Sequence, residues 1–451
     1  MTADASPELR RSVDARTAMA VVVANMIGAG IFTSTGFQAA ALGDPVQIYA
    51  LWIVGGVVAL CGAACYAELG TAMPEAGAEY VYLREAYGPS FGFMSAVVSL
   101  TAGFSAPIAA ALASLMAYLS HYLPWLHAQD VLLGLTPREL AAIAMVWALV
   151  ALHARGAMVG LGVTNLLTLF KVGSILVILV AAVAVGDGQL EQLWQASSSR
   201  PTGSELTSEL ASSLVFVMFC YSGWNSAAYL AGELREPERV LPRALLFGTL
   251  LVTVLYLGLN LVYFYGASVE ELAGKVEVAL VASEHLFGPT GGGLVTVALS
   301  VSLVAAASVM TAVGPRVYYA AGRDTAALSW LGRVDPEAGA PVRALVLQGA
   351  VTTVIIVLGT VDQIQQYAGL TLSLFATLTV GSLFVLRRRR SGRAVQTFRA
   401  FGYPFTPLLF IAVTIWMMVW AARARPLESA AALATVGLAG LMHTWLVRRM
   451  P

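Results

Sequence analysis

The sequence contains little charge for its length. Only 12% of its 451 residues are charged, whereas 58% are hydrophobic, and the mean hydropathy is +0.76. Because a soluble chain carries about 25% charged residues, this composition excludes an ordinary soluble protein. The formal net charge is zero, so the basic footprint expected of a nucleic-acid-binding protein is absent. We therefore expect a protein that crosses a lipid bilayer several times.

Cysteine and histidine are also scarce, which bears on enzyme and metal chemistry. The three cysteines, Cys61, Cys65 and Cys220, lie within apolar runs, and this excludes a disulfide framework. No grouping of cysteine and histidine has the spacing of a metal site. The five histidines are scattered near the ends of apolar runs and in loops. A membrane enzyme or a receptor is thus the least favoured alternative, and we expect no cofactor and no metal.

Long apolar runs dominate what is present. A membrane-crossing helix needs about 20 largely apolar residues, and twelve runs approach or exceed this length. The runs are 17–41, 48–71, 91–119, 140–153, 163–185, 206–232, 245–265, 294–319, 344–359, 366–386, 407–422 and 430–447. Their continuity excludes the alternating strands of a membrane barrel. The sequence predicts an all-α integral membrane protein with about 12 transmembrane helices, in one domain of residues 17–447 after a polar tail, residues 1–16.

The positions of the cations predict the orientation of these helices. With twelve spans, 20 of the 26 lysines and arginines fall on the side that holds both termini, and 5 fall on the other side. Under the positive-inside rule this bias places both termini in the cytoplasm, and we expect the cell membrane as the location. The remaining cation, Lys171, lies inside the fifth run. An intramembrane charge usually faces the interior and serves function; the alternative is a lysine that snorkels to the cytoplasmic surface.

Two apolar runs are interrupted by glycine at corresponding places. The first run contains Gly28-Ala29-Gly30, and the sixth contains Ser222-Gly223-Trp224-Asn225. Matching breaks in the first helices of two five-helix halves indicate an inverted-repeat transporter with a binding site near the midplane. Unwound backbone would bind a carboxylate through N–H groups and an ammonium through carbonyls. The alternative is that these glycines only allow close helix packing.

Several motifs resemble those of the amino acid–polyamine–organocation (APC) superfamily, especially its L-type amino acid transporters and their bacterial relatives. The motifs are VANMIGAGIF, YAELGTAMPEAGAEYVYLREAYG, NLLTLFKVGSILVIL, FCYSGWNSAAYLAGELREPERVLPRAL, APVRALVLQ and FRAFGYPFTPLLF. The resemblance implies the five-plus-five inverted-repeat fold shared with sodium-coupled neurotransmitter transporters, the LeuT-like fold. The expected repeats are residues 17–186 and 206–387, with two additional helices in 404–447.

The resemblance also implies a set of site residues. The stretch that would bind the substrate carboxylate is Ile27, Gly28, Ala29 and Gly30. Phe219 matches the aromatic residue that closes over the substrate. The stretch that would take the ammonium and line the side-chain pocket is Tyr221, Ser222, Gly223, Trp224 and Asn225, with Ser226 next to it. Lys171 matches the lysine that replaces a sodium ion and links the fifth helix to the first, and we expect it to couple the motions of transport.

The chain departs from the family pattern in three ways. Ala29 stands where the animal L-type members often have serine, and Ser226 stands where some transporters of large substrates have an aromatic residue. No cysteine suits a disulfide to a glycoprotein partner, so we expect no obligatory partner subunit. The favoured function is alternating-access transport, often as exchange, of small to medium neutral L-amino acids. The alternative is a proton-linked permease for amines, cationic amino acids or polyamines, which an acid in the pocket would favour.

Overall fold

The structure is a computed structural model that describes residues 13–75, 77–128, 134–155, 161–324, 328–335, 340–389 and 398–448. Within these ranges the regular structure is helical, apart from one isolated bridge between Val13 and Leu234. The all-α prediction is confirmed. Most of the polar tail expected at residues 1–16 lies outside the described residues, which begin at Val13.

Ten helical segments of the described chain are long and apolar enough to cross a membrane. They are α3 (Pro45–Ala72), the continuous α5, η2 and α6 (Pro89–Val98, Ser99–Ser105 and Ala106–Ser120), α7 (Pro137–Ala154), α8 (Leu161–Val185), α9 with η5 (Gly203–Tyr221 and Ser222–Glu233), α10 (Pro237–Gly266), α12 (Val278–Asp324), α14 (Val361–Arg389), α15 (Phe405–Ala424) and α16 (Pro426–Arg448). The prediction of a multi-pass membrane protein is confirmed.

The first and ninth predicted runs form shorter helices. The first run is divided into α1 (Ala15–Met26), a single tight turn η1 (Gly30–Phe32) and α2 (Ser34–Leu42). The ninth run forms α13 (Val342–Leu358), which has 17 residues. The division of the first run falls at the glycine pair from which the sequence predicts a break.

Local sequence signals define the ends of the helices around this first break. The Asp14 carboxylate accepts a hydrogen bond from the Thr17 N–H and caps α1. Gly43 ends α2 with a left-handed backbone (φ +59°), which glycine adopts without steric cost. Asp44 then caps α3 by accepting from the Val46 N–H, 3.0 Å away. Each cap satisfies a backbone group that a helix end leaves without a partner.

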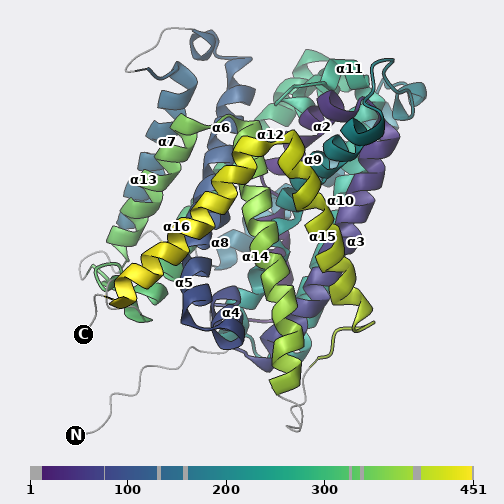
Figure 1. Cartoon of the computed structure of the whole chain (residues 1–451). Helices are drawn as coiled ribbons and strands as arrows, with labels where there is room; N and C mark the ends of the chain where they lie inside the picture. The colour runs from purple at the N-terminus through teal and green to yellow at the C-terminus, as the bar shows by residue number, and fades with distance from the viewer. Residues whose placement is uncertain are drawn as a thin grey trace, which may run out of the picture.

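The helices form one bundle with two distinct ends (Figure 1). The short helix α4 (Glu79–Tyr87) lies at the lower end in this view, and the short helix α11 (Val269–Leu272) lies at the upper end. We refer to these as the α4 end and the α11 end. Helices α14, α15 and α16 cover one face, while α7 and α13 pack against each other at an edge. The α4 and α11 segments thereby mark the two surfaces between which the long helices run.

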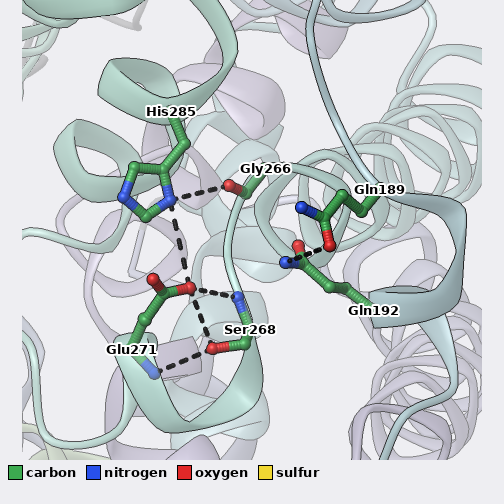
Figure 2. Close-up of polar contacts among 6 residues, drawn as sticks. All are labelled: Gln189, Gln192, Gly266, Ser268, Glu271 and His285. Carbon is green, nitrogen blue, oxygen red and sulfur yellow. Dashed lines mark hydrogen bonds and ion pairs between the residues drawn. The ribbon is translucent and has the colours of Figure 1, made fainter.

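At the α11 end, hydrogen bonds fix the corner where α10, α11 and α12 meet (Figure 2). Ser268 and Glu271 cap α11 reciprocally: the Glu271 carboxylate accepts from the Ser268 N–H at 2.8 Å, and the Ser268 hydroxyl accepts from the Glu271 N–H at 3.3 Å. His285 on α12 places Nδ1 2.9 Å from the Gly266 carbonyl and 4.0 Å from Glu271 Oε2. These contacts connect the end of α10 to the beginning of α12.

Helix α8 shows how the bundle separates its buried and exposed faces. Residues three or four apart line one side of a helix. The buried side consists of Lys171, Ile175, Ile178 and Ala182. The opposite side is apolar and exposed, as a lipid-facing surface is, and includes Leu169, Val177, Val180 and Val183. The one charged side chain of α8 therefore points into the bundle, at a place where burial is costly without a partner.

Candidate functional site

The first break leaves backbone groups without their helical partners. Helix α1 ends at Met26, and Gly28 and Ala29 lie between α1 and η1. Among the backbone hydrogen bonds of the described residues, none is donated by the Gly28 or Ala29 N–H. A Cβ built on Gly28 would meet no atom within 4 Å, so this backbone borders open space. Unpaired backbone inside a membrane protein is tolerated where it lines a cavity.

Lys171 contacts the carbonyls on the α1 side of this break. Its ammonium donates to the Ile27 carbonyl at 3.0 Å and to the Ala24 carbonyl at 3.3 Å. The side chain is only 3% exposed, which excludes the alternative that it snorkels to the surface. Helix α8 is thus tied to the unwound end of α1 by a buried, charged donor.

A tyrosine that sequence reasoning missed joins the two breaks. The Tyr256 hydroxyl, from α10, lies 2.5 Å from the Met26 carbonyl and 3.3 Å from the Cys220 carbonyl. Both carbonyls lie at the point where an α-helix stops. The sequence offers little signal for this contact, because Tyr256 is one aromatic residue within a long apolar run.

The second break begins where α9 ends at Tyr221. From Ser222 to Glu233 the chain winds more tightly, as η5, and lies directly against α1. A Cβ on Gly223 would lie 2.5 Å from the carbonyl carbon of Asn25, so only glycine fits this close approach. Gly30 is similar, because its Cβ would lie 2.4 Å from Cys220 Sγ. Close packing therefore accounts for Gly30 and Gly223, whereas Gly28 faces open space.

A cavity of about 450 Å³ lies where the two breaks meet. Eight of the residues predicted for the site line it: Gly28, Ala29, Gly30, Phe219, Ser222, Gly223, Asn225 and Ser226. Three others do not line it, and their side chains are at most 3% exposed: Ile27, Tyr221 and Trp224. The breaks thus bring two segments that are about 190 positions apart in the sequence to one cavity.

The three side chains away from the cavity pack into the bundle. Tyr221 donates its hydroxyl to the Trp52 carbonyl at 3.3 Å. The Trp224 ring meets the Tyr66 ring edge to face, with centroids 4.6 Å apart. Ile27 contributes its carbonyl to Lys171. The expectation that Tyr221 and Trp224 line a side-chain pocket differs from this arrangement, because the end of α9 and the beginning of η5 direct the two rings toward α3.

The remaining wall of the cavity is largely apolar. Helix α12 contributes Ala306, Val309 and Met310, and α14 contributes Leu372. Beside them, α5 continues into the wider π-helical turn η2, from which Phe104 lines the cavity. A wider turn of this kind displaces side chains from the regular α-helical positions and is common at functional sites. Near the breaks, the cavity therefore offers backbone polarity on one side and hydrocarbon on the other.

Toward the α4 end the cavity is lined by charged residues, among them Glu79, Glu233 and Arg316. Glu79 was not expected there, because the sequence places it in a connection outside the apolar runs. It is 8% exposed and accepts hydrogen bonds from Tyr66, from Asn225 at 2.9 Å and from Tyr229. Burial raises the pKa of the Glu79 carboxyl, and these hydrogen bonds oppose that shift.

Toward the α11 end a buried layer of hydrogen bonds lies next to the lining residues Gly30 and Cys220. Ser34 donates to Gln365 Oε1 at 2.9 Å, and the Gln365 amide donates to the Thr33 hydroxyl at 2.7 Å. Thr35 donates to Asn260 Oδ1 at 2.8 Å. All five side chains are 0% exposed. Charged residues therefore line the cavity toward the α4 end, and packed polar side chains lie beyond its lining toward the α11 end.

A bundle of membrane-crossing helices with a cavity between two broken helices is the architecture of a secondary transporter. The sequence profile of the amino acid permease family matches residues 14–441, and the chain belongs to this family. The protein is thus a membrane transporter of amino acids and not an enzyme, and its family has the LeuT-like fold.

Three characterised relatives illustrate the range of the family. The serine/threonine exchanger SteT of Bacillus subtilis is 27% identical over 416 residues, which cover 91% of each chain. The mouse b(0,+)-type amino acid transporter 1 is 27% identical over 416 residues, covering 91% of this chain and 82% of the relative. The human cystine/glutamate transporter is 27% identical over 419 residues, covering 91% and 80%.

Proposed function

We propose that the protein exchanges small to medium neutral L-amino acids by alternating access. The observation that carries this proposal is the cavity at the two breaks, which combines unpaired backbone with an apolar wall. The zwitterionic backbone of an amino acid needs the unpaired backbone groups, and a neutral side chain needs the apolar wall. The relatives named as a serine/threonine exchanger and as amino acid transporters support the same class of substrate.

The substrate backbone would bind between the breaks. Its carboxylate would accept hydrogen bonds from the N–H groups of Gly28, Ala29 and Gly30, next to the beginning of η1 and α2. Its ammonium would donate to carbonyls of the second break, near Ser222 and Gly223. Ile27 would act through its carbonyl, which already holds Lys171. The contact between Lys171 and the first break would couple the motion of α1 to α8.

The substrate side chain would extend toward Phe219 and the α12 wall, with Asn225 and Ser226 beyond them. Phe219 would close the cavity on the α11 side, where it is 7% exposed. Tyr221 and Trp224 would support the break by packing, since their rings lie against α3. Because Ala29 and Ser226 are small, the cavity would leave room for a side chain of small to medium size.

The topology proposed from the cation bias makes the α4 end cytoplasmic, with both termini there, in the cell membrane. Residues 17–186 and 206–387 would form the two inverted repeats, and residues 404–447 would add two helices. The cavity would then face the cytoplasm in this structure. The three cysteines are buried within helices, so we propose that the protein works without a disulfide-linked partner subunit.

A proton-linked permease for amines, cationic amino acids or polyamines is the second candidate. Glu79 favours it, because a carboxylate on the cavity wall can bind a proton or lie near a cationic substrate. Purified protein in proteoliposomes separates the two. Exchange is supported if uptake of labelled L-serine requires unlabelled amino acid inside the proteoliposomes and does not change with an imposed pH gradient. Uptake of putrescine or L-arginine driven by the gradient supports the second candidate.

The substrate class is tested by thermal shift of the purified protein against all standard amino acids and common amines. Binding to the folded state raises its apparent stability by about 2.7 kcal/mol at 100 times the dissociation constant. Stabilisation by several neutral L-amino acids is the expected result. Stabilisation by polyamines alone would overturn the proposed substrate class.

A further inference from the structure

Glu79 occupies an unusual position for a carboxylate. It is the first residue of α4, and the preceding Ala78 has a positive φ of 40° although it is not glycine. Ala78 is 0% exposed. A backbone conformation that L-residues rarely adopt persists where the surroundings impose it, and such positions cluster at functional sites. Here the turn directs the first side chain of α4 into the bundle.

The Glu79 carboxylate is bound by three neutral donors from two other elements. The Tyr66 hydroxyl, from α3, and the Asn225 amide both donate to Oε1. The Tyr229 hydroxyl donates to Oε2 at 3.4 Å. Asn225 and Tyr229 both belong to η5. Among the ion pairs of the described residues none includes Glu79, so hydrogen bonds alone hold this carboxylate.

The segment that these bonds hold is joined to α1. The Ser226 hydroxyl donates to the Val21 carbonyl at 3.3 Å, and the backbone of Gly223 packs on Asn25. Before α1, the Val13 N–H donates to the Glu233 carbonyl at 3.0 Å. Helix α1 and η5 are thus connected along their length. In the described part of the chain, the side-chain hydrogen bonds from η5 to α3 or α4 are those that end on Glu79.

We propose that Glu79 is an inner latch, a positioning residue whose hydrogen bonds to Asn225 and Tyr229 hold η5 and α1 against α3 and α4. This inference rests on the proposed function. The latch stabilises the arrangement in which the cavity opens at the α4 end. For the cavity to open at the opposite end, η5 and α1 move relative to α4, and both bonds break. Because Asn225 also lines the cavity, the latch connects the pocket to α4.

The charge of the latch can be removed while its size is kept. In Glu79→Gln one acceptor oxygen becomes an NH2 donor, so the neutral amide cannot accept hydrogen bonds from all three donors, and the negative charge that strengthens these bonds is lost. Tyr229→Phe removes one donor and keeps the ring. Glu85→Gln is the matched control, because Glu85 lies on the same helix with its side chain 52% exposed. These substitutions separate the latch from the general charge of α4.

The conformation is measured on detergent-solubilised protein with a cysteine introduced at Ala312, which lines the cavity. The rate at which a maleimide labels Ala312→Cys reports how often the cavity is open, and the chain without this substitution gives the background of the three native cysteines. We expect Glu79→Gln to lower the labelling rate about five- to tenfold and Tyr229→Phe to lower it less. Glu85→Gln should leave it unchanged.

Exchange of labelled L-serine in proteoliposomes supplies the second measurement. The latch predicts a lower maximal rate with little change in KM. An unchanged labelling rate in a well-folded Glu79→Gln variant would overturn the proposal. If the KM for L-serine were raised while the labelling rate stayed unchanged, Glu79 would instead be a site for the substrate ammonium. If Glu79→Gln does not fold, Tyr229→Phe decides the question by the same two readouts. If the parent exchanges no amino acid, the proposed function fails, while the labelling rates still test the latch.

Discussion

The contact between Lys171 and the first break gives the most direct test of how this transporter couples its helices. In Lys171→Met the stem of the side chain is largely preserved and the ammonium is lost. The Ile27 and Ala24 carbonyls, 3.0 and 3.3 Å from that ammonium, then lose a buried, charged donor. Hydrogen bonds to charged groups contribute about 1.5–3 kcal/mol each.

The magnitude determines what the assay must resolve. If about 2–3 kcal/mol of this stabilisation is present in only one conformation, its loss shifts the conformational equilibrium about 30- to 140-fold, since each 1.4 kcal/mol is tenfold. We expect exchange of labelled L-serine in proteoliposomes to slow by at least tenfold. If the pocket is intact, L-serine should still raise the melting temperature of the Lys171→Met variant in detergent.

The chain provides a matched control, because it contains only one other lysine. Lys275 is exposed, so Lys275→Met removes the same charge and leaves the first break unchanged. Its exchange rate should equal that of the parent. A folded Lys171→Met variant whose exchange rate stays within twofold of the parent would refute the reasoning, because the contact would then be structural only.

Three further predictions concern the breaks and the α11 end. Gly30→Ala should abolish exchange, because its Cβ would lie 2.4 Å from Cys220 Sγ. In Gly28→Ala the added Cβ meets no atom within 4 Å, so this variant should fold normally and reduce exchange only modestly. Tyr256→Phe should slow exchange and lower the melting temperature, because two carbonyls lose a buried donor. Hydrogen bonds from its cap hold the pKa of Glu271 below its ordinary value of 4.5, so its contribution to stability is present at neutral pH and lost as the pH falls. Glu271→Ala should therefore lower the melting temperature at pH 7, and the difference should narrow toward pH 3.5.

Much of the fold could be predicted because membrane insertion imposes a simple rule on sequence. Each apolar run must satisfy its backbone hydrogen bonds internally, so it forms a helix. The break at Gly28 could be predicted for the same reason, since a glycine pair within an apolar run weakens the helix there. The position of Lys171 within a run indicated a buried contact, although the sequence did not decide between a buried and a snorkelling side chain.

The sequence could not reveal the side-chain contacts that distant elements make around the two breaks. Tyr256 is one of several aromatic residues in apolar runs, and only the packing of α10 against α1 brings its hydroxyl to the Met26 carbonyl. Trp224 lies beside Asn225 in the same motif, yet one side chain packs on α3 and the other lines the cavity. Helical periodicity does not predict which of these two neighbours lines the cavity, because η5 does not follow the α-helical repeat.

By itself, the amino-acid sequence determined the class of this protein. Its scarcity of charge and its long apolar runs indicated a helical membrane bundle, because the bilayer selects both composition and run length. Its motifs indicated the amino acid permease family. Only the tertiary structure decided that Glu79 is buried beside Asn225. The sequence indicates only an amphipathic segment there, and the backbone at Ala78 turns the next side chain inward. That direction depends on contacts between elements distant in sequence, and no local pattern encodes it.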